Sequence, residues 1–324
     1  MTALPGFAGG RFLVMGRAGM DLYADPPGAR AELAMGFSTA LGGSAANIAV
    51  ALVRQGMRAS LLTCVSDDAV GRFALNQLDN YGVDRRHVRV VGGDARTSLA
   101  VVETRMQDHQ SVIYRNAAAD FQMDRQDVEA VDYGGHDALV VTGTVFAADP
   151  SRSAAFHAAH LAQAARMPVV LDLDYRPYSW TSAGFAAEIL GRAAGMANLV
   201  VGNDVEWGML AGGPSAGLDL ARRLAKAGAC VIYKMGAAGA VTLFGDDEVR
   251  TGIYATEAIK PVGAGDGFLG GMLAGLARGQ ALHASVLRGS ATAAMVVARV
   301  GCAPAMPTSD ALDRFIAGHP GPSL

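Results

Sequence analysis

Short apolar runs alternate with segments of helical periodicity along most of this sequence, and few folds accommodate that alternation. The runs that read as buried strands are residues 12–15, 60–65, 138–141, 169–173, 199–201, 230–234 and 240–244. The segments with apolar residues three or four apart are 44–56, 70–81, 151–166, 185–194, 218–227, 266–278 and 282–300. Strands without polar alternation are buried on both faces. The pattern therefore predicts an α/β protein with a mainly parallel central sheet flanked by helices. We expect Ser44 to cap the first helix, and Gly56 and Gly82 to end the first two.

One region interrupts this alternation. Residues 97–103 and 111–115 are both β-rich, and only a short polar stretch around Asp108 separates them. Without a crossover helix between them, they are predicted to form an antiparallel hairpin. We expect a small β-rich lid over a ligand cleft, formed by segments of about 17–41 and 96–117. With no internal repeat and no Pro- or Ser-rich linker, residues 1–324 are predicted to form a single α/β domain.

Composition excludes several classes of protein. Hydrophobic residues make up 51% of the chain and charged residues 18%, which excludes a disordered protein. The 27 Lys and Arg residues are outnumbered by 30 Asp and Glu residues and do not cluster, so we expect no nucleic-acid partner.

The same reading predicts a cytoplasmic protein without a membrane partner. The cysteines, at positions 64, 230 and 302, form no CxxC pair, which fits a reducing compartment. Residues 33–53 are uncharged but contain Gly, Ser, Thr and Asn, so they make a poor membrane helix. The apolar run 12–15 is too short for a secretion signal.

The strongest chemical signal lies where the helix near residue 266 begins. It reads Gly263-Ala264-Gly265-Asp266. Small residues leave backbone N–H groups bare at the positive end of a helix, which suits phosphate oxygens. Asp266 in the first turn would stay ionised and could take a proton from a hydroxyl. On spacing alone, an ordinary glycine-rich turn explains these residues equally well.

Other signatures of catalysis are missing from the sequence. It contains no GxxxxGK[ST], no GxGxxG opening a helix after the first strand, no GxSxG and no HExxH. These absences argue against a Walker-A nucleotide site, a dinucleotide site, a serine hydrolase and a zinc protease.

Taken together, four groups of residues resemble the PfkB/ribokinase family of carbohydrate kinases in order and spacing. They are Gly42-Gly43 with Asn47, Asn203-x-x-Glu206, Lys234 with Gly236 and Gly239, and Gly263-Ala264-Gly265-Asp266. The resemblance covers essentially the whole chain. It implies a ribokinase-like fold and an enzyme that uses ATP and Mg²⁺.

The resemblance also implies roles at the phosphate end of the site. The amides of Gly263, Ala264 and Gly265 would form an anion hole for the γ-phosphate, while Asp266 orients and deprotonates the alcohol. Asn203 and Glu206 would act through Mg²⁺ and its waters, although a helix cap is the alternative explanation. The remaining expected nucleotide contacts are Lys234, Gly236, Gly239, Ser290, Ala293, Ala294 and Val297.

At the sugar end, the family's substrate positions correspond to Asp21, Gly42, Gly43 and Asn47. Arg115, Asp174 and Arg176 would bind an acidic substrate, since a neutral sugar needs no guanidinium. Arg17 is a third candidate for this role. The alternative for Arg176 is a structural pair with Asp172 or Asp174.

Further residues resemble one branch of the family. They are Gly16-Arg17, Asp21-Leu22, and residues 113–115, 173–180 and 305–307. That branch phosphorylates the C6 hydroxyl of 5-dehydro-2-deoxygluconate during myo-inositol breakdown. Pro304 departs from its pattern, which has an acidic residue there. The alternatives are 2-dehydro-3-deoxygluconate, then a neutral sugar such as ribose or fructose, then a silent sugar- or nucleotide-binding relative.

Two expectations concern ions and assembly. Many family members carry an acidic residue that helps to hold a monovalent cation beside the anion hole, where this chain has Lys260-Pro261. We expect no activation by K⁺, with the Lys260 ammonium in or near the cation position. Solvent exposure of that lysine is the alternative. Because lids in this family often pair with a partner's lid, we also expect a homodimer.

Overall fold

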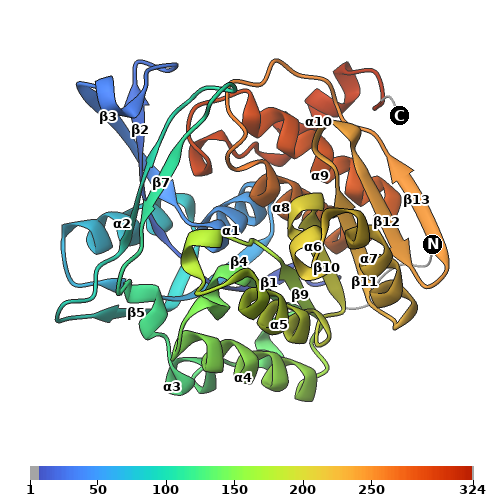
Figure 1. Cartoon of the computed structure of the whole chain (residues 1–324), viewed down its shortest axis with the longest axis horizontal. Coiled ribbons are helices and arrows are strands. Elements are labelled where there is room, and N and C mark those ends of the chain that lie inside the picture. Colours follow the sequence, from blue (N-terminus) through green and yellow to red (C-terminus); the bar gives the residue numbers. More distant parts are fainter. Residues whose placement is uncertain (1–6, 323–324) are drawn as a thin grey trace.

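The computed structural model describes residues 7–322, which form two sheets and their covering helices (Figure 1). The strands are β1 (Arg11–Met15), β2 (Gly19–Asp25), β3 (Gly36–Gly42), β4 (Arg58–Ser66), β5 (Asp84–Val91), β6 (Ser98–Val102), β7 (Ser111–Tyr114), β8 (Ala138–Thr142), β9 (Val169–Asp172), β10 (Leu199–Asn203), β11 (Cys230–Lys234), β12 (Ala240–Phe244) and β13 (Asp247–Thr251). The helices are α1 (Ser44–Arg54), α2 (Ala69–Tyr81), α3 (Arg125–Glu129), α4 (Ser151–Ala164), α5 (Ala183–Ala194), α6 (Asp204–Leu210), α7 (Gly217–Lys226), α8 (Ala264–Ala277), α9 (Leu282–Val297) and α10 (Ser309–Gly318).

The large sheet has nine strands in the order β13-β12-β11-β10-β9-β8-β1-β4-β5. The seven strands from β11 to β5 are parallel to their neighbours, and β12 and β13 add an antiparallel edge. The expected mainly parallel α/β fold is confirmed. Strand order reverses beside β1, because β4 lies on one side of it and β8 on the other. Ligands of open α/β sheets bind at such a point, outside the carboxyl ends of the strands.

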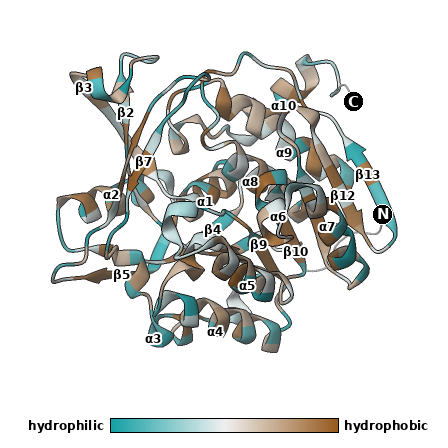
Figure 2. Ribbon diagram, viewed as in Figure 1, coloured by the Kyte–Doolittle hydropathy of each residue, from teal (hydrophilic) through white to brown (hydrophobic). Residues whose placement is uncertain are grey.

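Alternating side chains of the buried strands feed two hydrophobic cores. In β1, Leu13 and Met15 belong to the core packed under α4, α5 and α7, whereas Phe12 and Val14 belong to the core under α1, α8 and α9. Figure 2 shows the hydrophobic colour on the inner strands and the hydrophilic colour on edge strand β13. Helices thus cover both faces of the large sheet. Polar side chains can therefore gather only at the ends of its strands.

The small sheet has the order β3-β2-β6-β7 and projects from the body (Figure 1). β6 and β7 are antiparallel, as predicted for the hairpin. The four strands come from the two segments expected to form the lid.

Several local expectations need correction. Ser44 does not cap α1: Gly43 is the N-cap, with φ of 98°, and the Ser44 hydroxyl donates to Asp174 instead. The sequence pattern also predicts none of β5, β13, α3, α6 and α10, and it ends α9 three residues too late. These elements are short helices or lie at sheet edges and chain ends, where apolar patterning is weak. Gly82, by contrast, ends α2 in the left-handed conformation, as expected.

Candidate active site

A single cavity of about 940 Å³ lies along the carboxyl ends of the parallel strands and reaches under the small sheet. Its lining residues come both from the body, such as Lys234, and from the small sheet, such as Ala100 and Ile113. Nearly all the residues expected at the site line this cavity. They are Asp21, Gly43, Asn47, Arg115, Asp174, Arg176, Asn203, Glu206, Lys234, Gly236, Gly239, Gly263, Ala264, Gly265, Asp266, Ser290, Ala293, Ala294 and Val297. Gly42 is the one expected residue that does not line it directly.

The helix α8 begins inside the cavity. Gly263 is its N-cap in the left-handed conformation, with φ of 86°. A side chain there would also meet Cys302, because an added Cβ would lie 2.7 Å from the Cys302 sulfur. Glycine is therefore required for this turn on both counts. Residues 263–265 line the cavity at the positive end of a 14-residue helix, where an anion is favoured.

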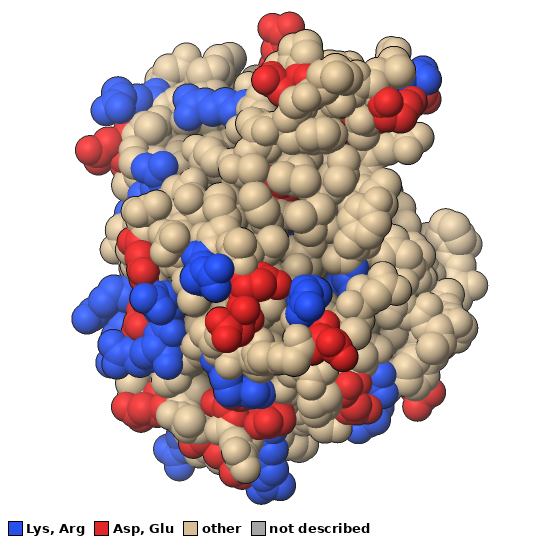
Figure 3. Space-filling view, turned by 90° about the vertical axis from the view of Figure 1, so that its left-hand side faces the viewer, with Lys and Arg blue, Asp and Glu red and all other residues tan. Residues whose placement is uncertain are grey.

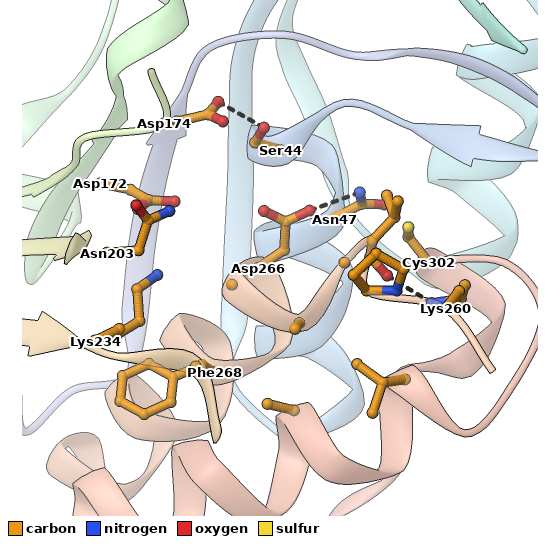
Figure 4. A pocket seen from close by; sticks show the side chains of 18 of the residues that line it. Ser44, Asn47, Asp172, Asp174, Asn203, Lys234, Lys260, Asp266, Phe268 and Cys302 are labelled. Atoms are coloured by element: carbon orange, nitrogen blue, oxygen red, sulfur yellow. Dashed lines mark hydrogen bonds between the residues drawn. The ribbon is translucent and has the colours of Figure 1, made fainter. Parts of the chain in front are cut away.

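Asp266 lies at the centre of the site, between Asn47 on one side and Lys234 on the other (Figure 4). The Asn47 amide donates to Asp266 Oδ2 at 2.8 Å, joining α1 to α8. Burial and the charge of Asp174 raise the pKa of the Asp266 carboxyl to about 7, although the Asn47 hydrogen bond opposes the rise. The expectation that Asp266 stays ionised at the start of the helix is therefore wrong, because burial outweighs the helix end. A carboxyl with a pKa near neutrality can still exchange protons with a substrate hydroxyl.

Lys234 ends strand β11 and lies beside the start of α8. An added Cβ at Gly265 would lie 3.3 Å from its ammonium nitrogen, which also sits 5.8 Å from the centre of the Phe268 ring. The lysine is thus placed to contact an anion held by the amides of the helix start.

Carboxylates crowd the same end of the cavity. Burial, together with the charges of Asp174, Glu206 and Asp266, raises the pKa of Asp172 well above its usual range, although Lys234 opposes the rise. From the sequence, Asp172 is expected only as a possible partner for Arg176. Its position after an apolar strand, at the carboxyl edge of the sheet, is the signal that would have placed it in the site.

Asn203 and Glu206 form a reciprocal helix cap. The Glu206 amide donates to the Asn203 side chain at 2.9 Å, and the Asn203 amide donates to Glu206 Oε2 at 2.7 Å. The capping alternative is therefore present in the structure. It does not exclude contact with a hydrated ion, because both side chains still line the cavity.

The sugar end of the cavity holds polar atoms that are buried without a partner. Asp21 Oδ2 accepts from the Tyr23 hydroxyl at 3.2 Å, but Oδ1 of that carboxylate has no partner within residues 7–322. Asn47 Oδ1 is equally unpartnered in the described chain. A side chain on Gly42 would collide with Asp21, which explains the glycine. Buried polar atoms normally find a partner, so these two are suited to ligand hydroxyls.

Asp174 anchors a network at the same end. Its carboxylate accepts from Ser44 at 2.6 Å and from Thr144 at 3.2 Å, and it pairs with Arg176 at 2.8 Å. The structural pairing considered for Arg176 is therefore present. Ser44, Thr144, Tyr178 and Cys302 line the cavity although no motif singled them out. Thr144 follows strand β8 beside β1, so the strand pattern contained a signal for it.

Lys260 is fully buried beside the anion hole, not exposed to solvent. Its ammonium donates to the carbonyl of Val262 at 2.6 Å and to the carbonyl of Val296 at 3.1 Å. Burial lowers the pKa of that ammonium, while the charges of Asp266 and Asp21 oppose the shift.

The fold and the cavity together are those of a phosphotransferase acting on sugars. The family model of the pfkB family carbohydrate kinases matches residues 11–309, and this chain belongs to that family. It is therefore a carbohydrate kinase, an enzyme class that transfers a phosphoryl group from ATP to an alcohol.

Individual relatives are more specific. The chain is 37% identical over 310 residues to a 5-dehydro-2-deoxygluconokinase of Photobacterium profundum, covering 94% of each chain. It is 32% identical to an enzyme of that name from Shouchella clausii, over 91% of this chain and 92% of that one.

Solved structures share the fold. A double-mutant fructokinase of Vibrio cholerae O395, bound to fructose, ADP and potassium ion, superposes with a TM-score of 0.83 at 25% identity, over 97% of this chain and 99% of that one. The aminoimidazole riboside kinase of Salmonella enterica gives a TM-score of 0.80 at 23% identity, over 95% and 100% of the two chains. The predicted ribokinase-like fold is confirmed.

Proposed function

We propose that this carbohydrate kinase phosphorylates a terminal hydroxyl of a keto-deoxy sugar acid, 5-dehydro-2-deoxygluconate, at C6. The observation that carries the proposal is a sugar end lined by three arginines, in a chain whose relatives at 30–37% identity are 5-dehydro-2-deoxygluconokinases. A place in myo-inositol breakdown follows from that substrate.

In the proposed reaction, Asp21 and Asn47 hold sugar hydroxyls through the oxygens that lack partners in the described chain. Asp266 takes the proton of the attacking hydroxyl, and its Asn47 hydrogen bond fixes the carboxylate's orientation. The amides of residues 263–265 and the Lys234 ammonium stabilise the charge on the transferring phosphoryl group. Glycines 236 and 239 and the α9 side chains Ser290 and Ala294 form the nucleotide end.

We propose that Mg²⁺ is held mainly through water and nucleotide phosphates, near Glu206 and Asn203. Within residues 7–322, no three His, Cys, Asp or Glu side chains are grouped to hold a metal directly. The crowded carboxylates around Asp172 nevertheless fit a divalent cation, whose charge would relieve their repulsion. When bound, Mg²⁺ neutralises phosphate charge; the chain's own residues orient the two substrates.

We also propose that K⁺ does not activate the enzyme. The Lys260 ammonium already binds the Val262 and Val296 carbonyls, the kind of oxygen that a monovalent cation would use. Activity in Na⁺-free Tris buffer should not change when K⁺ is added. Lys260→Met should lower kcat by about tenfold or more, the scale of lost charge-assisted hydrogen bonds. Clear K⁺ activation of the unaltered enzyme, or a silent Lys260→Met, would contradict this assignment.

We propose a homodimer that associates through the small sheet. Apolar side chains are exposed there: Met35 is 100% exposed, Leu33 72% and Tyr114 61%. On the face drawn in Figure 3, charged side chains gather in the lower half and near the upper and left edges, and the central area between them is mostly uncharged. Exposed apolar patches of this kind mark interaction surfaces.

We propose a cytoplasmic location. Cys64, Cys230 and Cys302 are all free and buried, as in a reducing compartment. No helix within residues 7–322 combines the length and the apolar character needed to cross a membrane.

The test of the substrate is an ADP-release screen with 5-dehydro-2-deoxygluconate, 2-dehydro-3-deoxygluconate, ribose and fructose. We expect the highest kcat/KM for the first. A higher value for ribose or fructose would overturn the sugar-acid proposal, and a higher value for the second acid would reassign the substrate within it.

A further inference from the structure

Three arginine side chains converge at the sugar end of the cavity. Arg17, Arg115 and Arg176 all line it. Their charges act on one common group: partial burial raises the pKa of the Tyr178 hydroxyl, and all three guanidinium charges oppose that rise. The three arginines therefore surround one part of the cavity, but they need not contribute equally to binding an anion.

Two of the three already have carboxylate partners. Arg115 is buried in an ion pair with Asp120 and donates to the Thr144 carbonyl at 3.1 Å. Arg176 pairs with Asp174 at 2.8 Å. Within each pair the charges cancel, and the donors that face the partner are occupied. Arg115 and Arg176 therefore line the cavity but add little net positive charge to it.

Arg17 differs from both. Its side chain is buried, with 7% of the residue exposed, and its guanidinium donates to the neutral Ser98 hydroxyl at 2.7 Å. Among residues 7–322, no Asp or Glu forms an ion pair with it. The Asp21 carboxylate feels its charge, yet stays outside contact distance. A buried guanidinium without a carboxylate is energetically costly and marks a place for an incoming anion.

The surrounding chain holds Arg17 in this position. It lies between β1 and β2, where the large sheet passes into the small one. The Ala46 amide donates to the Arg17 carbonyl at 3.3 Å, which ties its backbone to the start of α1. An added Cβ at Gly19 would lie 2.8 Å from the guanidinium, so glycine at that position leaves room for the side chain.

We infer that Arg17 is the residue that binds the substrate carboxylate and thereby selects acidic sugars over neutral ones. This inference rests on the proposed function and adds the specificity-determining residue. The planar guanidinium fork matches a carboxylate with two parallel hydrogen bonds, and a neutral polyol would leave the charge unpaired. A phosphate group on a sugar has related chemistry, so the test includes it.

The experiment compares Arg17→Ala and Arg17→Lys with the unaltered enzyme on three substrates. These are 5-dehydro-2-deoxygluconate, its analogue with the carboxylate reduced to an alcohol, and fructose 6-phosphate. For the acid, Arg17→Ala should lower kcat/KM by about 30-fold or more, the scale for truncating one partner of a buried charge pair. For the alcohol analogue the change should stay within about threefold, because that analogue has no negative charge for the guanidinium to pair with. Arg17→Lys keeps the charge without the fork, so it should fall between.

The matched control is Arg96→Ala. Arg96 lies two residues from Ser98, its side chain is 61% exposed, and it does not line the cavity. It should leave kcat/KM unchanged for all three substrates. ATP binding and the Tm of each variant show whether it folds. If Arg17→Ala does not fold, the acid-to-alcohol ratio of Arg17→Lys decides.

Each outcome has one meaning. Equal losses on the acid and the alcohol, or no loss on the acid, would overturn the role of Arg17 while leaving the sugar-acid kinase intact. If the unaltered enzyme prefers the sugar phosphate, the carboxylate assignment is wrong. If it prefers the neutral alcohol, the proposed function itself fails.

Discussion

The two sheets of this molecule differ in what covers their faces. In the large sheet, β8 is buried at every position, with helices on both sides. In the small sheet, β6 alternates between buried and half-buried residues, and β7 has no buried residue. The first is a closed scaffold whose strand ends hold charged groups in place. The second has only one face to pack, and its other face stays available for contact. We associate the transfer chemistry with the first sheet and substrate selection with the junction between them.

The strongest test of that division is the carboxylate on α8. Asp266→Asn should keep the fold and ATP binding but lower kcat by about 10²–10⁴-fold, the scale for loss of a general base. Single-turnover and steady-state ADP release measure the loss, and Tm reports the fold. Near-normal turnover of Asp266→Asn would show that Asp266 is not the base. The transfer chemistry would then no longer be assigned to the large sheet.

At the small sheet, Arg115→Ala should act mainly on stability. It leaves Asp120 buried without its cation, and breaking such a pair lowers the free energy of unfolding by about 3–5 kcal/mol. Losses in kcat/KM should be similar for the acid and its alcohol analogue.

The double variant Arg115→Met/Asp120→Leu is the control, since it removes both charges and should recover most of the stability measured by urea unfolding. Arg176→Ala should do less than Arg115→Ala, because that side chain is 43% exposed. A loss confined to the acid in either single variant would instead assign carboxylate binding to that arginine.

The pH dependence of kcat/KM tests the role assigned to the Asp266 carboxyl. A buried carboxyl with a pKa of about 7 is protonated below that pH and cannot accept a proton. The kcat/KM should therefore rise about tenfold per pH unit up to about pH 7 and level off above it.

Asn47→Ala removes a hydrogen bond that favours the carboxylate, so the midpoint should move to higher pH. The midpoint is the readout, because Asn47 also faces the substrate. A flat profile between pH 5 and 8 in the unaltered enzyme would contradict the assigned base.

The smallest effect on catalysis is expected from the outer face of the small sheet. Met35→Ser with Phe37→Ser should convert the proposed dimer to a monomer in light-scattering measurements, because both side chains are exposed apolar groups. Val90→Ser is the control: it is a comparably exposed valine on β5, away from this surface. A double variant that stays dimeric would place the interface elsewhere.

The same contrast explains how much of the fold the sequence predicts. The inner strands are predicted because they are continuous apolar runs, such as Cys230–Lys234. The edge strands β5 and β13 are missed because their sequences, DRRHVRVV and DEVRT, are rich in charge and face solvent on one side. The periodicity of apolar residues reports burial. It therefore predicts the buried inner strands and misses the exposed edge strands.

The site is predictable in its residue types but not in its pairings. The spacing of the glycines before Asp266 is explained equally well by an ordinary turn. Only the resemblance of the whole chain to the PfkB/ribokinase family favours a kinase. The partners of the arginines were not predictable, because Asp120 and Asp174 are brought to them by tertiary packing. The hydroxyl of Ser44 was expected to cap a helix. It donates instead to the Asp174 carboxylate, because a charged acceptor forms a stronger hydrogen bond than a neutral one.

The hydrogen bond between Asn47 and Asp266 has a consequence for how the enzyme is made. Its two residues are 219 positions apart in the sequence. At synthesis rates of about 5–20 residues per second, about 10–45 s pass between the emergence of the first and the second from the ribosome. During that interval the nascent chain carries the acceptors for a sugar but no base. Catalytic power thus arrives only with α8, the helix that also completes the hydrophobic core packed against α1.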